Sequence, residues 1–105
     1  MYFPVSALLI EFLILSIVDT ADSYGYEISQ TIKLIADIKE STLYPILKKL
    51  EKNGYLTTYI EEYQGRKRKY YSITENGKKQ LAFLHDEWIN YRDTINGIME
   101  GRIRN

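Results

Sequence analysis

The sequence contains no cysteine, one histidine and two prolines among its 105 residues. The absence of cysteine excludes disulfide bonds and thiolate metal sites, and it fits a reducing compartment such as the cytoplasm. The histidine, His85, has no second ligand type at metal-binding spacing, so we expect it at the surface of a helix. We therefore predict that the chain holds no metal.

The residue patterns of enzymes are also missing. The six glycines are scattered and form no phosphate-binding loop. With one histidine and no Ser/His/Asp group, the sequence offers nothing for nucleophilic chemistry. We predict that the protein is not an enzyme and needs no cofactor.

The apolar segment Val5–Val18 is interrupted by Ser6, Glu11 and Ser16. It is shorter than the roughly 20 residues of a membrane span. No basic residue precedes it, so it lacks the charged start of a signal peptide. We expect a buried helix that packs on both sides, no membrane segment and a cytoplasmic protein.

The net charge of zero hides an uneven distribution along the chain. Residues 1–30 hold four acids and no Lys or Arg, residues 31–70 hold nine bases and five acids, and residues 71–105 hold five of each. The positive charges of the middle third gather at Lys48, Lys49 and Lys52 and at Arg66, Lys67, Arg68 and Lys69. Such clusters occur on ordinary solvated faces as well as on nucleic-acid-binding surfaces, so their place in the fold decides their meaning.

Apolar spacing and capping residues predict three helices in the first half of the chain. The first spans about residues 6–20, and the second begins near Gly25. The second helix carries Ile28, Ile32 and Ile35 on one face, because they are spaced by four and three residues.

The third predicted helix has the clearest start signal. Ser41 is its expected N-cap, and Pro45 then falls within the first four residues, whose N–H groups lack helical partners. Asn53-Gly54 ends the helix, since glycine tolerates a left-handed backbone. Its inward stripe consists of Leu43, Leu47 and Leu50.

A β-hairpin and a long helix complete the prediction. Leu56–Glu61 and Arg68–Ile73 alternate and are rich in Tyr, Thr and Ile, with Gln64-Gly65 as the turn between them. The hairpin therefore has a basic tip and a basic return strand. Thr74 caps the final helix, which we expect to run from about Glu75 to Met99.

The final helix carries a heptad-like seam with alternating spacings of three and four residues. The seam consists of Leu81, Leu84, Trp88, Tyr91, Ile95 and Ile98. This spacing also occurs in helices that face their own core. We favour self-association through this seam and part of the first helix, because the three earlier helices already have each other to cover.

Three helices followed by a two-stranded hairpin is the order of a winged helix-turn-helix. The predicted fold is therefore mainly α with a small β-hairpin. Residues 1–73 form the expected DNA-binding domain, and residues 74–105 form the expected C-terminal dimerisation helix. In this architecture the third helix enters the major groove, and the hairpin, or wing, contacts the backbone or the neighbouring minor groove.

The charges fall where this geometry needs them. We expect the lysines of the third helix and the four bases of the wing to neutralise phosphates. Thr42 and Tyr44 are the better candidates for base edges, and Lys48 could reach a guanine. Ser41 lies at the same helix N-terminus, where free N–H groups can bind a phosphate. The expected partner is double-stranded operator DNA.

Several segments resemble the PadR family of transcriptional regulators. They are Gly25–Ile28, Ser41–Leu47, Leu50-Glu51, Gly54–Leu56, Gly65–Tyr71 and Ile73–Gly77. The resemblance covers about Leu8 to the end of the last helix and implies a dimeric repressor of the small subfamily, similar to its multidrug-sensing members. Tyr26, in the Gly-Tyr motif, joins the expected DNA-contacting residues, whereas Tyr24 departs from the histidine or small residue that is common before this motif.

Two alternatives remain open. Trp88 either only packs in the dimer interface or, as the resemblance implies, provides a ring on which a flat aromatic effector stacks at that interface. The function also has a rival, because winged helices serve as protein-interaction modules without DNA binding. A wing with four consecutive bases favours DNA over protein.

Overall fold

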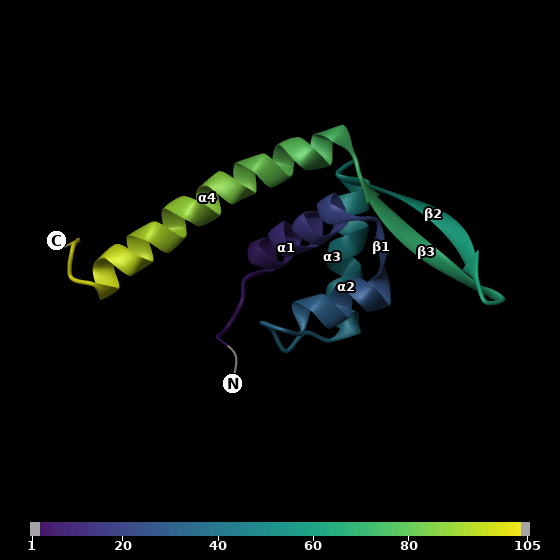
Figure 1. Cartoon of the computed structure of the whole chain (residues 1–105), viewed down its shortest axis with the longest axis horizontal. Helices are drawn as coiled ribbons and strands as arrows, with labels where there is room; N and C mark the ends of the chain where they lie inside the picture. Colours follow the sequence, from purple (N-terminus) through teal and green to yellow (C-terminus); the bar gives the residue numbers. More distant parts are fainter. Residues whose placement is uncertain (1–2, 104–105) are drawn as a thin grey trace.

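A computed structural model describes residues 3–103 of the chain. The element order confirms the expected winged helix-turn-helix with a long C-terminal helix (Figure 1). The elements are α1 (Ala7–Thr20), β1 (Ser23–Tyr24), α2 (Gly25–Ile32), α3 (Glu40–Lys52), β2 (Leu56–Tyr63), β3 (Arg66–Ile73) and α4 (Glu75–Met99).

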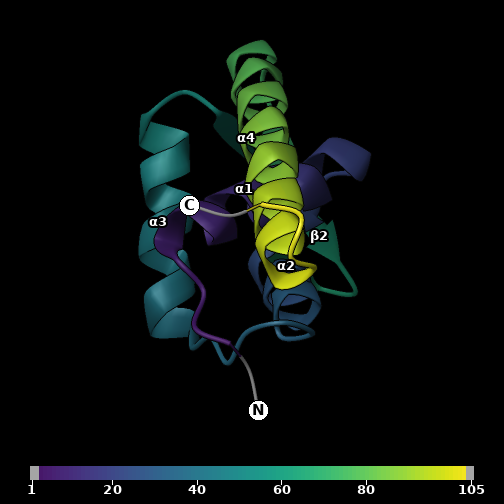
Figure 2. The ribbon, with the colours of Figure 1, turned by 90° about the vertical axis from the view of Figure 1, so that its left-hand side faces the viewer.

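Helix α1 packs on both sides, as its apolar composition predicts. It lies between α4 on one side and α2 and α3 on the other (Figures 1 and 2). Its start is capped by Ser6, whose hydroxyl accepts a hydrogen bond from the N–H of Leu9 at 3.2 Å. Among residues 3–103, no helix has both the length and the apolar character that a membrane crossing requires.

The core lies where α1, α2 and α3 meet. Leu43, Leu47 and Leu50 of α3 are fully buried, which confirms the expected inward stripe. Burial of each such side chain contributes about 1.5–3 kcal/mol relative to exposure. Ile28 and Ile32 of α2 are buried against the same cluster.

The expected start of α3 was wrong. The helix begins at Glu40, with Lys39 as N-cap, and Ser41 is its second residue. The carbonyl of Lys39 accepts the N–H groups of Thr42 and Leu43 at 2.9 and 3.0 Å, so the first turn closes without a capping hydroxyl. Pro45 is therefore the sixth residue of the helix, beyond the first turn, and cannot donate to the carbonyl of Ser41. The end was predicted correctly, with Asn53 as C-cap and Gly54 at φ +79°.

The apolar face of α2 is shorter than its spacing suggested. The helix ends at Ile32, and Ile35 lies beyond it, 44% exposed. Ala36 and Ile38 are buried in its place, because the chain turns at the helix end before it enters α3.

The sheet has three antiparallel strands in the order β1-β3-β2. β1 was not predicted, since two residues carry no periodicity. The hairpin strands are longer than expected and reach Tyr63 and Arg66. They do so because Gln64 and Gly65, at φ 51° and 79°, form a two-residue turn that joins the strands directly.

Helix α4 has the predicted bounds. The hydroxyl of Thr74 caps it by accepting from the N–H of Gly77 at 3.0 Å, and it donates to the carbonyl of Gly54 at 2.6 Å. Leu84 belongs to the common core, while the C-terminal half of α4 projects away from the other elements (Figure 1). The division between domains at residues 73 and 74 stays a prediction, and residues 104 and 105 lie outside the described part of the chain.

Candidate nucleic-acid interface

One side of α3 is exposed along its whole length. Ser41, Pro45, Lys48 and Lys52, spaced by four, three and four residues, lie opposite the buried leucines. This side brings together three of the residues expected to contact DNA, Ser41, Lys48 and Lys52. Two positive charges and a hydroxyl therefore share one solvent-facing stripe.

Tyr44 lies beside this stripe and close to the start of α2. A Cβ atom added to Gly25 would come within 2.8 Å of Cε1 and the hydroxyl of Tyr44, so the absence of a side chain lets the ring approach. Tyr44 is 42% exposed and Tyr26, next to Gly25, is 58% exposed. The close approach of ring and glycine gives Tyr44 a defined place at the surface.

Thr42 lies on the flank of α3 that faces the N-terminal segment. It is exposed and lines an open hollow of about 470 Å³ together with Ile10 and Ile46. Thr42 is thus separated from Tyr44, which lies on the other flank.

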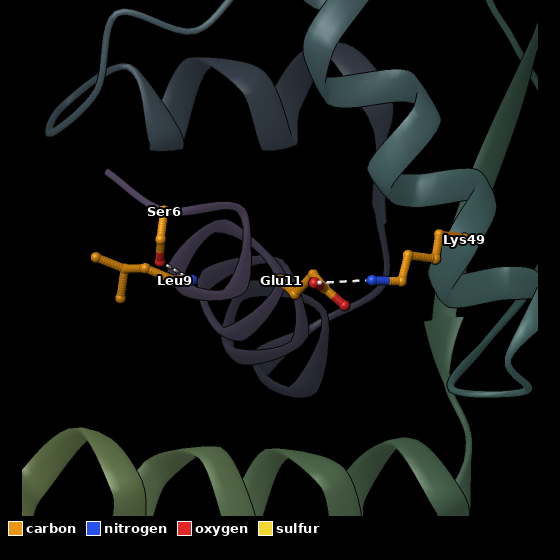
Figure 3. Close-up of polar contacts among 4 residues, drawn as sticks. All are labelled: Ser6, Leu9, Glu11 and Lys49. Atoms are coloured by element: carbon orange, nitrogen blue, oxygen red, sulfur yellow. Dashed lines mark hydrogen bonds and ion pairs between the residues drawn. The ribbon is translucent and has the colours of Figure 1, made fainter. Parts of the chain in front are cut away.

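Lys49 points away from the Lys48 and Lys52 stripe. Its ammonium nitrogen lies 3.4 Å from Oε2 of Glu11 on α1 (Figure 3). The Glu11 side chain is only 10% exposed and the Lys49 side chain 61% exposed. A nearly buried carboxylate is costly unless it is paired, so this contact binds Lys49 to α1.

The four bases of the wing fall into three environments. Arg66 and Lys67 are exposed beside the turn. Within residues 3–103 neither forms an ion pair, although Glu62 is the cross-strand neighbour of Lys67. These two side chains are the ones available to a partner at the tip.

Arg68 and Lys69 lie on opposite faces of β3, because successive side chains of a strand alternate. The guanidinium carbon of Arg68 lies 4.4 Å from the ring centre of Tyr24 and 4.3 Å from that of Tyr63. The pKa of Arg68 is raised, mainly by a hydrogen bond with the side chain of Tyr70. On the inner face, the ammonium nitrogen of Lys69 lies 3.6 Å from Oε1 of Glu51 on α3.

The outer face of the sheet is lined by aromatic rings. Tyr59 and Tyr70 stack with ring centres 5.5 Å apart, and Tyr24 meets Tyr70 edge-on at the same separation. The hydroxyl of Tyr59 donates to Oδ2 of Asp22 at 2.7 Å, and this bond is the main reason that the pKa of Tyr59 is raised to about 12. These tyrosines were not among the expected site residues. The alternation of side chains along a strand would have placed Tyr59 and Tyr63 on one face, since they are four residues apart.

The seam of α4 is divided between the chain's own core and solvent. Leu84 is buried and Leu81 packs against the same core, as in the core-facing alternative. Trp88 is half-buried, and the three members that follow it are exposed: Tyr91 by 64%, Ile95 by 37% and Ile98 by 59%.

A cavity of about 480 Å³ opens between the start of α1 and α4. Leu9 and Phe12 of α1 line one side, and Glu87, Trp88 and Tyr91 of α4 line the other. The ring centres of Trp88 and Tyr91 are 6.4 Å apart. Trp88 therefore borders a mostly apolar cavity that also contains the carboxylate of Glu87 in its lining.

His85 lies on the surface of α4, as predicted, with its side chain 60% exposed. Within residues 3–103, no group of three or more His, Asp or Glu side chains is arranged to hold a metal ion.

Comparisons with known proteins agree with this architecture. Residues 14–83 match the model of the transcriptional regulator PadR-like family. The chain is similar to a protein of known crystal structure from Streptococcus mutans UA159, with 70% identity, coverage of 100% of this chain and 99% of that one, and a TM-score of 0.96.

Two further relatives are more distant. A PadR family transcription regulator from Clostridium difficile is 33% identical, with coverage of 86% of this chain and 97% of that one and a TM-score of 0.78. An uncharacterized protein from Lysinibacillus sphaericus is 42% identical over 94 residues, which are 85% of this chain and 86% of that protein.

Proposed function

The chain belongs to the transcriptional regulator PadR-like family, and we propose that it is a dimeric repressor that binds pseudo-palindromic operator DNA through α3 and the wing. One observation carries the proposal. Lys48 and Lys52 lie on the exposed side of α3. Arg66 and Lys67, which form no ion pair among residues 3–103, lie at the tip of the hairpin. These are the two places where a winged helix meets DNA.

The proposed contacts divide by chemistry. Lys48, Lys52, Arg66 and Lys67 neutralise phosphates, which gives affinity and salt dependence. Thr42 and Tyr44 read base edges, and Ser41 and Tyr26 complete the surface. Lys49, Arg68 and Lys69 each have a partner within the chain, so we assign them supporting roles.

The proposed dimer forms through α4. Tyr91, Ile95 and Ile98 are exposed apolar side chains on one seam, and a second copy of the chain would cover them. A two-fold dimer presents two α3 helices about one duplex turn, ~34 Å, apart. Because repression acts on chromosomal DNA, the proposed location is the cytoplasm.

A flat aromatic effector is the proposed release signal. The cavity beside Trp88 has a volume of about 480 Å³, which lies within the usual range for small-molecule sites. Glu87 would favour a cationic ligand, and the indole ring would stack on its flat face. Such a ligand releases DNA only if it binds the DNA-free arrangement of the dimer more tightly.

Trp88 is the single tryptophan, so its fluorescence reports on this cavity alone. We expect planar aromatic cations to quench it, and Glu87→Gln to weaken the quenching by cations without changing that by neutral planar compounds. A panel of both classes that leaves the emission unchanged would remove the effector from the proposal.

The DNA-binding proposal is tested by fluorescence anisotropy with the DNA upstream of the protein's own coding sequence. The logarithm of the binding constant should fall linearly with the logarithm of the salt concentration, with a slope of about −0.9 for each phosphate neutralised. Absent or salt-insensitive binding would favour the alternative, a winged-helix module that binds protein.

A further inference from the structure

Arg68 lies between two aromatic rings that come from different parts of the fold. Tyr24 belongs to β1, directly before α2, and Tyr63 is the last residue of β2 before the turn. The guanidinium carbon is 4.4 Å from one ring centre and 4.3 Å from the other. Arg68 therefore joins the outer part of the wing to the start of the helix-turn-helix.

This contact extends the support of the wing beyond the sheet itself. β1 pairs with β3 only at Tyr70 and Tyr71, so the hairpin from Lys69 to the turn is two-stranded. Two-stranded ribbons twist more than wider sheets and are marginally stable alone. Figure 1 shows that the hairpin projects well past β1. Arg68 is two residues beyond Tyr70, the outermost residue of β3 that pairs with β1, where such support is needed.

A second contact joins the same two parts. The hydroxyl of Tyr59 on β2 donates to Asp22, which immediately precedes β1. Tyr59 also stacks on Tyr70, its cross-strand neighbour on β3. The short segment 22–24 thus contacts the outer face of the wing at two points, Asp22 with Tyr59 and Tyr24 with Arg68.

We propose that Arg68 is a positioning residue that presets the wing against the helix-turn-helix, and that it is not a phosphate contact. The inference rests on the proposed DNA binding and refines it. We call the contacts of Arg68 with Tyr24 and Tyr63 the clamp. When the clamp is intact, the hairpin is already ordered before Arg66 and Lys67 reach the DNA. Without the clamp, the free-energy cost of ordering the hairpin weakens DNA binding, while the number of phosphate contacts stays the same.

Salt dependence separates the two roles of a positive charge. Removing a phosphate contact reduces the magnitude of the salt slope by about 0.9, whereas removing a positioning contact leaves the slope unchanged. Lysine keeps the charge of arginine but not its planar group, which stacks on aromatic faces. Arg68→Lys therefore loses the stacking of a planar group on both rings and retains the charge.

The experiment compares Arg68→Lys, Arg68→Ala and Tyr63→Ala with Lys67→Ala in the anisotropy assay at several salt concentrations. Tyr63 is 49% exposed, so its truncation leaves the core intact. The first three variants should bind about three- to tenfold more weakly at every salt concentration with the wild-type slope. Lys67→Ala should reduce the magnitude of the slope by about 1.8, because the dimer loses one phosphate contact in each of its two wings.

Amide hydrogen exchange provides a readout without DNA. Residues 60–69 should exchange faster in Arg68→Lys and Tyr63→Ala, while α1, α2 and α3 keep wild-type protection. Wild-type affinity of Arg68→Lys, a slope whose magnitude falls by about 1.8 in Arg68→Ala, or unchanged exchange in the wing would each overturn the inference. If the wild type itself fails to bind DNA, the proposed function fails, and a result confined to the Arg68 variants overturns the inference alone.

Discussion

The carboxylate of Glu11 on α1 lies 3.4 Å from the ammonium nitrogen of Lys49 on α3 (Figure 3). Thirty-eight positions separate the two residues in the sequence. Glu11 is nearly buried and Lys49 extends into solvent, so the pair fixes one flank of α3 to α1. The lysines of α3 therefore differ in role, although they are adjacent in the chain.

Lys48 and Lys49 form a matched pair for testing this difference. Lys49→Ala leaves Glu11 without its partner, and we expect a loss of about 1–2 kcal/mol in the free energy of unfolding. This value is the lower part of the range for an unsatisfied buried acceptor, because the lysine is mostly exposed. Lys48→Ala should change stability by less than about 0.5 kcal/mol.

The salt dependence of DNA binding should show the opposite order. Lys48→Ala should reduce the magnitude of the slope by about 1.8, since the dimer carries two copies of α3, and Lys49→Ala should leave it unchanged. Denaturant unfolding and anisotropy measure the two quantities. An equal reduction of the slope in both variants would show that Lys49 leaves Glu11 and contacts DNA, and a wild-type slope in Lys48→Ala would contradict the phosphate contact of Lys48.

Gly25→Ala should displace Tyr44. The added Cβ would lie 2.8 Å from Cε1 and the hydroxyl of the ring, which must move because no carbon approaches that closely. We expect a folded protein with weaker DNA binding. In a Tyr44→Ala background the same substitution should have no further effect on affinity, since the obstacle is gone. A non-zero further loss in that background would place the cause elsewhere in α2.

The sequence indicated the basic residues of α3 and the wing but not which of them have partners within the chain. The bounds of α4 and the stripe of Leu43, Leu47 and Leu50 were predicted, because periodicity and capping are local properties. The Glu11 and Lys49 contact was not, since it depends on how two helices cross. The clamp around Arg68 was missed for the same reason: β1 brings Tyr24 beside the wing, and two residues give no strand signal. The wing was accordingly treated as one basic patch, where the structure has three environments.

Ile98→Glu should dissociate the dimer. Ile98 lies on the exposed seam of α4, and a buried, unpaired carboxylate on both copies opposes association. Phe83→Glu is the matched control, because Phe83 is equally exposed on α4 but lies off the seam. Sedimentation velocity should give a monomer for Ile98→Glu and a dimer for Phe83→Glu. The reverse pattern would move the interface to another face of the helix.

Tyr59 should ionise at a higher pH than an ordinary tyrosine. Its bond to Asp22 favours the neutral phenol and raises the pKa to about 12 in the folded chain, against 10.0 for an unperturbed tyrosine. The raised pKa means that the stabilisation is complete below about pH 10 and is lost as the pH rises toward 12. The difference between the absorbance titrations of the wild type and Tyr59→Phe isolates this group. A midpoint near 10 in that difference would contradict the hydrogen bond.

Hydroxyl-radical footprinting on the upstream DNA tests the central claim, that a dimer binds an operator through two α3 helices and two wings. We predict two symmetric protected patches whose centres lie about one helical turn, 10–10.5 base pairs, apart. The combined Arg66→Ala and Lys67→Ala variant should weaken protection where the wings lie and spare the patches of α3. A single patch without two-fold symmetry, or no protection at concentrations that saturate a non-specific DNA control, would contradict the account.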